Sequence, residues 1–168
     1  MPQINDLKVK LGLPPVSQIG VIVRDVYKAA DYYTSLFGVG PFTIYDFEPE
    51  QHIYNGTPTA SKIRMGKAMW GNIELELLQP LEGESPQMDF FLQHGEGLHH
   101  LGFFVPNFDE LCENFLREGF KPVLEAASYV ENYKGSIKVR YWDTDKIVGV
   151  LFEIIYKSWL PECQPRRA

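Results

Sequence analysis

The sequence lacks the marks of several large protein classes. Two cysteines in 168 residues, Cys112 and Cys163, provide neither a disulfide framework nor a cysteine-based zinc site. No apolar run is long enough to span a membrane, and the first residues do not resemble a secretory signal. There is no run rich in lysine and arginine, and the net charge of −6 argues against nucleic acid or an anionic membrane as the main partner. We therefore expect a cytoplasmic protein, not bound to membrane or nucleic acid, whose partner is a small molecule.

The composition is that of an ordinary folded domain. Hydrophobic residues make up 45% of the chain and aromatic residues 14%, enough for a core and for the walls of a pocket. The length suits one domain, or two small repeats that share a sheet.

Two apolar stretches share one pattern: a polar residue able to bind a metal, an aliphatic residue, a glycine and an apolar run. Gln18 precedes Gly20 in the first stretch, and His100 precedes Gly102 in the second. Both stretches are rich in β-branched and aromatic residues, so each predicts a strand with alternating side chains. On this pattern His99 faces away from His100 and is expected to have a structural or hydrogen-bonding role, not a ligand role.

A second pair of strands repeats a carboxylate. Glu76 and Glu153 each interrupt an apolar strand, and 77 residues separate them, against 82 between Gln18 and His100. An unpartnered buried carboxylate is costly, so each needs a cation or hydrogen bonds. Nearby Glu74 shares the face of Glu76 and is expected to be a solvated carboxylate at a strand end; the alternatives are a residue that supports a ligand or an auxiliary base.

Helix signals follow each of the two glycine-containing strands. Asp25 is placed to cap a first helix that stops at Gly38, and Asn107 to cap a second that ends at Gly119. Residues 85–95 predict a short linking helix with a serine cap and a proline in its first turn.

Two further strands are expected in each half, between the helix and the carboxylate strand. The predicted fold is α+β: tandem βαβββ repeats form a curved mixed sheet around a central cavity, with the helices outside. The expected division is an N-terminal extension (1–15), one domain (16–157) with half-repeats 16–80 and 98–156, and a C-terminal tail (158–168).

The duplicated pattern resembles the vicinal oxygen chelate superfamily, which includes glyoxalase I, methylmalonyl-CoA epimerase, extradiol dioxygenases and bleomycin-resistance proteins. The segments most similar to the epimerases are Glu76-Leu77-Leu78-Gln79-Pro80-Leu81, Ser85-Pro86, Phe91-Leu92 and Gly95-Glu96-Gly97-Leu98-His99-His100. Those epimerases usually have histidine where this chain has Gln18. The set Gln18, Glu76, His100 and Glu153 is similar to the ligands of the zinc-type glyoxalase I.

These four residues suit one divalent metal ion. Amide oxygen, imidazole nitrogen and two carboxylates fit zinc, cobalt, manganese, nickel or iron. A carbonyl or thioester oxygen bound there would be polarised, and a metal-stabilised enolate would form on proton abstraction. The resemblance implies that Glu153 or Glu76 is the catalytic base. Returning the proton to the opposite face is epimerisation, an isomerase reaction; returning it to the neighbouring carbon is the lyase reaction of glyoxalase I.

The leading prediction is a metal-dependent isomerase similar to methylmalonyl-CoA epimerase, acting on an acyl-CoA. The first alternative is a lactoylglutathione lyase of the glyoxalase I type, acting on a hemithioacetal or α-keto compound. The second is a metal-free binding protein of the bleomycin-resistance type, with aromatic residues for stacking. A ring-cleaving dioxygenase fits less well, since only one histidine aligns. Symmetry makes a homodimer the default assembly.

Other polar residues are expected to be ordinary. His52 and His94 fall in a predicted loop and at a helix end, where most histidines are exposed bystanders. Arg64, Lys138 and Arg140 lie on predicted strands and are expected to be solvated or paired, with contact to a substrate carboxylate or CoA phosphates as the alternative.

Overall fold

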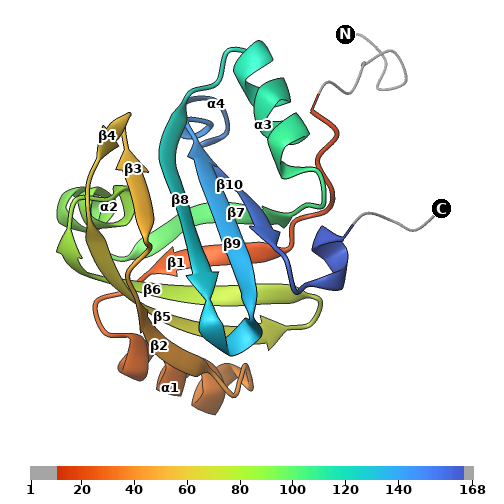
Figure 1. Ribbon diagram of the computed structural model, residues 1–168. Coiled ribbons are helices and arrows are strands. Elements are labelled where there is room, and N and C mark those ends of the chain that lie inside the picture. Colours follow the sequence, from red (N-terminus) through yellow and green to blue (C-terminus); the bar gives the residue numbers. More distant parts are fainter. Residues whose placement is uncertain (1–10, 165–168) are drawn as a thin grey trace, which may run out of the picture.

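A computed structural model describes residues 11–164 as one curled, mixed sheet with helices on its outer side (Figure 1). Within these residues the ten strands follow the order β2-β5-β6-β1-β7-β10-β9-β8-β3-β4. The predicted α+β architecture is therefore confirmed. No helix between residues 11 and 164 has both the length and the apolar character needed to cross a bilayer.

The first half begins with a strand and a well-capped helix. The Asp25 side chain accepts hydrogen bonds from the backbone N–H groups of Tyr27 and Lys28, and Gly38 ends the helix with a positive φ of 68°. Both predicted end signals are confirmed. The elements are β1 (Gln18–Ile22), α1 (Val26–Phe37), β2 (Thr43–Phe47), β3 (Gln51–Tyr54), β4 (Thr57–Pro58), β5 (Ser61–Trp70) and β6 (Ile73–Gly83).

The first half thus has two strands more than predicted. The β3–β4 hairpin does not join its own half; β3 pairs with β8 of the second half. The backbone N–H of Asn55 also donates to the carbonyl of Val123, and the Tyr54 hydroxyl donates to Asp89 of the linking helix. The hairpin covers what would otherwise be a free edge of the sheet.

The second half has the predicted βαβββ order. Asn107 lies at the start of its helix, but its side chain makes no capping hydrogen bond and donates to Glu110 instead, so the predicted cap is wrong. The linking helix is α2 (Pro86–His94), followed by β7 (Gly97–Phe104), α3 (Phe108–Arg117), β8 (Pro122–Val130), β9 (Gly135–Trp142), α4 (Asp145–Val148) and β10 (Leu151–Lys157). Short 3₁₀ turns cover Glu131–Tyr133 and Pro161–Cys163.

Alternation along the strands separates the core from the cavity. Leu75 and Leu77 of β6 pack toward α1, while Phe103 of β7 and Ile154 of β10 pack toward α3. The residues between them face the inside of the sheet. The inner face is therefore free to hold a site.

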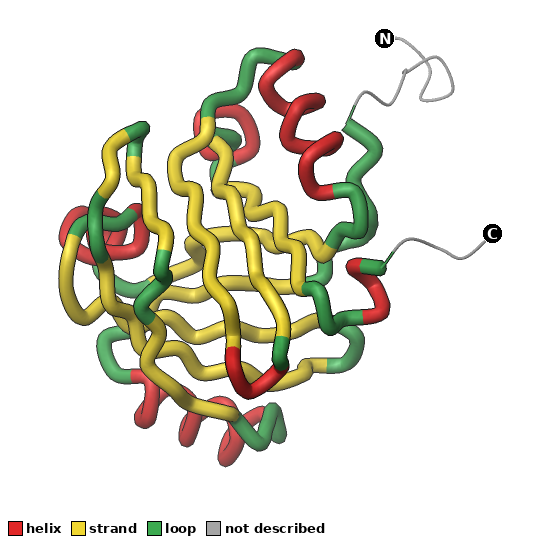
Figure 2. The backbone as a smooth tube through the Cα atoms, in the orientation of Figure 1, coloured by secondary structure: helices red, strands yellow, loops and turns green. Residues whose placement is uncertain are grey.

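The two halves meet where β1 pairs antiparallel with β7. β2 and β3 stand near opposite ends of the strand order, yet only residues 48–50 separate them in the chain. So short a link requires the two ends of the sheet to approach each other, and the backbone tube shows the resulting curl (Figure 2).

The division into extension, domain and tail stays a prediction. Residues 1–10 and 165–168, which include most of the predicted extension and part of the predicted tail, lie outside the described residues. Cys112 and Cys163 are both free and buried.

Candidate metal centre

Four side chains from four adjacent strands converge at the centre of the sheet. Gln18 (β1), Glu76 (β6), His100 (β7) and Glu153 (β10) are all at least 95% buried. His100 Nε2 lies 3.1 Å from Glu153 Oε2, 3.2 Å from Gln18 Oε1 and 3.4 Å from Glu76 Oε2. The structure thus brings together all four residues that the sequence predicts as ligands.

The two glycines of the repeat make room for the two ligands that precede them. β1 and β7 run antiparallel, with Gln18 opposite Gly102 and Gly20 opposite His100. A Cβ added at Gly20 would lie 2.0 Å from the His100 ring, and one at Gly102 would lie 2.8 Å from Gln18 Oε1. Each strand therefore supplies one ligand and the space for the other.

Glu74 orients the Gln18 amide. Gln18 Nε2 donates to Glu74 Oε1 at 2.7 Å, and because a carboxylate accepts hydrogen bonds, this contact turns Gln18 Oε1 toward His100. The Glu74 side chain is 19% exposed. The expectation of a solvated strand-end carboxylate is therefore wrong: the register of β6 against β1 places Glu74 beside Gln18.

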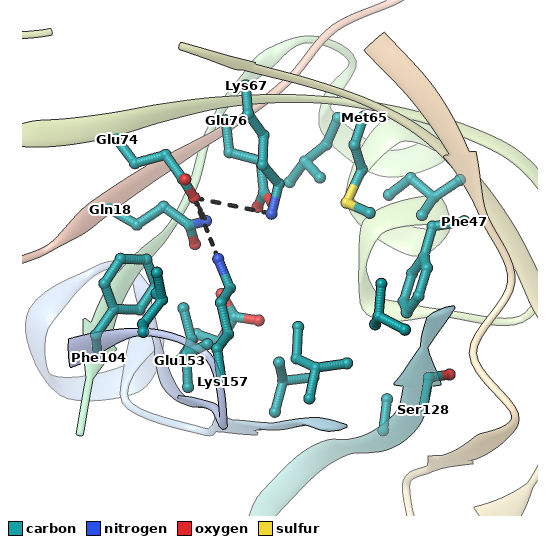
Figure 3. A pocket seen from close by; sticks show the side chains of 18 of the residues that line it. Gln18, Phe47, Met65, Lys67, Glu74, Glu76, Phe104, Ser128, Glu153 and Lys157 are labelled. Atoms are coloured by element: carbon teal, nitrogen blue, oxygen red, sulfur yellow. Dashed lines mark hydrogen bonds and ion pairs between the residues drawn. The ribbon is translucent and has the colours of Figure 1, made fainter. Parts of the chain in front are cut away.

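Lys67 of β5 neutralises Glu76. Its Nζ lies 2.7 Å from Glu76 Oε1, the oxygen that faces away from His100, and 3.8 Å from Glu74 Oε1 (Figure 3). Burial opposes the charged form of both groups, but the charge of Lys67 holds the pKa of Glu76 below its usual value, and Glu76 raises the pKa of Lys67 well above its own. Sequence reasoning missed Lys67, whose partner depends on the register of β5 against β6.

A second lysine enters from β10. Lys157 is 7% exposed, and its Nζ lies 3.7 Å from Glu74 Oε1 and 4.5 Å from the centre of the Phe104 ring. Lys157 follows Glu153 by four residues, so strand alternation places both on the inner face. This spacing of four residues from Glu153 could have indicated from the sequence that Lys157 lies on the inner face.

Glu153 has a different environment from Glu76. Its Oε2 is buried and, although close to His100, makes no well-aligned hydrogen bond with any described residue. Tyr141 stands opposite Glu153 in the β9–β10 register, and burial, then the charge of Glu153, raises the pKa of Tyr141 well above its usual value. Tyr141 is therefore a neutral neighbour, and no lysine pairs with Glu153 among the described residues.

His99 faces the same site as His100. The β1–β7 register shifts by one residue, so Val21 stands opposite Leu98 and His99 is the extra residue of a bulge. His99 Nδ1 lies 3.1 Å from His100 Nδ1. The predicted outward orientation of His99 is wrong, because simple alternation fails at a bulge.

The two histidines differ in protonation. Burial, with the neighbouring His100, lowers the pKa of His99 to about 3, so its ring is neutral. Burial also disfavours charge on His100, but Glu153 and Glu76 raise its pKa to about 9. Neutral His99 can accept a hydrogen bond from His100 Nδ1–H, which directs the other nitrogen, Nε2, toward the carboxylates.

Gln18, Glu76 and Glu153, together with Glu74 and the two lysines, form the floor of a cavity of about 1320 Å³. Its far wall includes Met65, Phe47 and Ser128 (Figure 3). His52 also lines it, 6% exposed, with its ring nitrogens 2.8 Å from Thr59 Oγ1 and 3.0 Å from Ser61 Oγ. The expectation that His52 is exposed is wrong, because the β3–β4 hairpin folds it inward.

The remaining predictions for ordinary polar residues are confirmed. His94 is exposed. The three cations on strands are paired, Arg64 with Asp46, Arg140 with Glu125 and Lys138 with Asp109.

The donor set fits a divalent ion. Ligand atoms of Glu76, His100 and Glu153 lie within 4.8 Å of one another. Ligands of a tetrahedral or octahedral ion with bonds of about 2.1 Å lie about 3.0 to 3.4 Å apart, which matches the separations around His100 Nε2. Glu76 offers Oε2 while Lys67 holds its Oε1, so that ion pair and metal binding are compatible.

Comparisons with known proteins agree with this geometry. A model of the glyoxalase/bleomycin resistance protein/dioxygenase superfamily matches residues 17–141, most of the chain. The chain belongs to this superfamily. The vicinal oxygen chelate resemblance is thereby confirmed, and members of the superfamily typically bind a divalent metal.

Individual relatives are more distant. An uncharacterized protein of Bacillus subtilis, YqjC, is 26% identical over 88 residues, which are 52% of this chain and 55% of that protein. Methylmalonyl-CoA epimerase from Mycobacterium tuberculosis is 19% identical with a TM-score of 0.63, over 91% of this chain and 94% of that chain. A variant of the Streptomyces coelicolor epimerase, in complex with 2-nitronate-propionyl-CoA, is 17% identical with a TM-score of 0.66, over 88% and 99%. At such identities the two structures establish a common fold.

Proposed function

We propose that the protein is a divalent-metal-dependent enzyme that abstracts a proton next to a carbonyl or thioester group. The observation that carries this proposal is the convergence of three oxygens from Gln18, Glu76 and Glu153 on His100 Nε2, at 3.1 to 3.4 Å, on the floor of a large cavity. These four residues would hold the ion, which we expect to be zinc, cobalt, manganese, nickel or iron. When bound, the ion would polarise a carbonyl oxygen and acidify the neighbouring C–H bond.

Within this site Glu153 is the better base. Glu76 is held by the Lys67 ammonium, which stabilises its charged form and weakens it as a proton acceptor. Glu153 has no such partner, and its Oε2 is without a well-aligned hydrogen bond. We assign proton abstraction to Glu153 and a ligand role, rather than a catalytic one, to Glu76.

The leading reaction is epimerisation of an acyl-CoA. The support is the fold shared with two methylmalonyl-CoA epimerases, one of them bound to 2-nitronate-propionyl-CoA. In such a reaction Glu153 removes the proton from one face of the substrate, and a proton donor on the other side of the planar enolate delivers a proton to the opposite face. The chemistry is that of an isomerase.

A glyoxalase I-type lyase is the second candidate, favoured by one observation. Gln18 stands at the first ligand position, and Glu74 turns its amide oxygen, not its nitrogen, toward His100. Gln, Glu, His and Glu is the ligand set that resembles zinc-type glyoxalase I. Here the proton taken by Glu153 would return to the adjacent carbon. The homodimer and the cytoplasmic location stay predictions.

Two experiments test the proposal. The first is metal content by plasma mass spectrometry, on protein prepared without chelator or nickel resin, for the native chain and for His100→Ala. We expect about one equivalent per chain in the native protein and none in the variant. Native protein that stays empty after metal addition would contradict the metal centre.

The second experiment follows exchange of an α-proton in deuterated solvent by NMR. Metal-loaded protein is offered 2-methylacyl-CoA thioesters, 2-oxo acids and the hemithioacetal of methylglyoxal with glutathione. Exchange into a thioester identifies the epimerase, and isomerisation of the hemithioacetal identifies the lyase. If no substrate in any class exchanges, proton abstraction is wrong.

A further inference from the structure

The floor of the cavity holds more positive charge than its metal ligands explain. Lys67 and Lys157 approach from β5 and β10, and both ammonium groups point toward Glu74 Oε1 (Figure 3). Lys157 is buried and Lys67 is largely buried, with side chains 8% and 16% exposed. A buried ammonium group is costly unless it is fully compensated.

Lys157 is the less well compensated of the two. Lys67 contacts Glu76 at 2.7 Å, whereas the one ion pair of Lys157 within residues 11–164 is with Glu74 at 3.7 Å, too long for a hydrogen bond. Glu74 Oε1 already accepts from Gln18 at 2.7 Å. Burial, with the charge of Lys67, accordingly lowers the pKa of Lys157. Its ammonium group has donors left over and faces the cavity.

The sum of the charges on the floor of the cavity indicates that a metal-loaded site would lack one negative charge. Three carboxylates, the buried Glu76 and Glu153 and the partly buried Glu74, face two ammonium groups on the floor. A divalent ion on a neutral His100 would leave this group with one positive charge in excess. A substrate carrying one negative charge would restore neutrality.

The excess positive charge is confined to the floor of the cavity. Lys67 and Lys157 are the only lysine or arginine residues among the described residues that line the cavity. Apart from the three carboxylates of the floor, the other ionised side chains of the lining are exposed carboxylates: Asp46, Glu48, Glu50, Glu131 and Glu162. An anionic group that enters is therefore stabilised only beside the metal centre.

We propose that Lys157, together with Lys67, binds a carboxylate group of the substrate next to the carbonyl that the metal centre would activate. The substrate class is thus a carbonyl compound or thioester that also carries a carboxylate near the reacting carbon. This inference rests on the proposed function and adds a recognition element to it. Lys157 Nζ supplies the free donors, while Lys67 adds charge and stays paired with Glu76.

The test compares two probes that differ in charge alone. Malonomonohydroxamate bears a hydroxamate that can chelate a metal and a carboxylate; its counterpart replaces the carboxylate with a neutral primary amide. Affinities are measured by calorimetry on metal-loaded and on metal-free full-length protein. We expect the acid to bind the loaded protein about tenfold or more tightly than the amide.

Variants of Lys157 test whether this residue causes the preference for the acid over the amide. Lys157→Gln should reduce the acid-to-amide ratio to about one while leaving the affinity for the amide unchanged, and Lys157→Arg should retain most of the ratio. Lys138→Gln, a change at a half-exposed lysine outside the cavity lining, is the matched control and should keep the native ratio. Thermal unfolding of each variant checks that it folds.

The outcomes separate the inference from the function on which it rests. Equal binding of both probes to loaded protein, or a ratio that survives in Lys157→Gln, overturns the carboxylate site even where metal binding and proton exchange are intact. If the native protein does not bind metal, the proposed function is overturned instead. The metal-free comparison then decides the carboxylate site, because a preference for the acid that depends on Lys157 supports it and equal binding overturns it.

Discussion

Glu76 and Glu153 occupy equivalent positions in the two halves, yet their surroundings differ. Each lies on the strand that pairs parallel with a glycine-containing central strand, Glu76 opposite Gly20 and Glu153 opposite Gly102. Only Glu76 has a lysine at hydrogen-bonding distance. The halves have thus kept the positions of the carboxylates while their neighbours have diverged.

The difference shows how a duplicated site acquires two roles. A lysine beside one carboxylate lowers its basicity and holds it in place, and its absence leaves the other carboxylate able to accept a proton. Under the proposed function, the same backbone geometry would therefore provide a fixed ligand in one half and a base in the other.

Replacing each glutamate separately by glutamine should affect different properties: Glu153→Gln mainly the rate, and Glu76→Gln mainly the stability. Glu153→Gln should lower kcat for proton exchange by about 10²- to 10⁴-fold, because it removes the base, and should destabilise the metal-free protein less than Glu76→Gln does, because His100 can release its proton when Glu153 is replaced. Glu76→Gln leaves Lys67 buried without its close partner, so it should destabilise the protein by up to about 3 kcal/mol. Deuterium exchange and urea unfolding measure the two effects.

A double variant provides the control for the stability effect. Adding Lys67→Met to Glu76→Gln removes the unpaired ammonium and should restore much of the lost stability. If Glu76→Gln retains full stability, or if Glu153→Gln retains native kcat, the two glutamates do not have the different roles assigned to them.

The two glycines of the repeat should also respond unequally to alanine. In Gly20→Ala the new Cβ meets the His100 ring at 2.0 Å, so the ring must leave its position. We expect a loss of about 1 to 3 kcal/mol in stability and loss of bound metal. In Gly102→Ala the new Cβ meets Gln18 Oε1 at 2.8 Å and Ile155 Cδ1 at 2.9 Å, which can rotate aside, and Gln18 Cβ at 2.9 Å, which requires a small shift of the strand. We expect a lower cost than for Gly20→Ala, about 1 kcal/mol.

Thermal unfolding and metal content of these two variants, measured together, test the comparison. Retention of a full equivalent of metal in Gly20→Ala would mean that His100 is not a required ligand. A larger defect in Gly102→Ala than in Gly20→Ala would reverse the order derived from the contacts.

The pH dependence of the stability of the metal-free protein should report the protonation of His100, at the junction of the two halves. Its pKa in the folded protein is about 9, against an ordinary 6.5, so its charged form stabilises the metal-free fold. This contribution is complete below about pH 6.5 and is lost as the pH rises through about 9. The melting temperature of metal-free protein should therefore fall between pH 7 and pH 10 by more in the native chain than in His100→Gln.

The same protonation predicts a proton released when metal binds. Near pH 7 the ion must displace the His100 proton, so affinity should rise with pH up to about 9. Calorimetry in buffers of different ionisation enthalpy counts the proton. Metal affinity independent of pH between 7 and 9 would contradict the assigned protonation of His100.

Much of the fold could be predicted because its signals are local. The Asp25 cap, the helix that ends at Gly38 and the linking helix after Ser85 each depend on residues within a few positions of one another. The β3–β4 hairpin could not be placed in this way, because its partner β8 lies about seventy residues further along the chain.

The sequence by itself determined the duplication, and with it the four residues that meet at the centre. Gln18 and His100, like Glu76 and Glu153, are related by a repeat that can be found without coordinates, and strand alternation places each on an inner face. Only the tertiary structure decided which other side chains contact these residues. Lys67 meets Glu76 through strand register, His99 turns inward through a bulge, and Lys157 meets Glu74 because two strands from different halves curl around one cavity. Such contacts depend on chain segments far apart in sequence, where neither local propensity nor spacing specifies which side chains will meet.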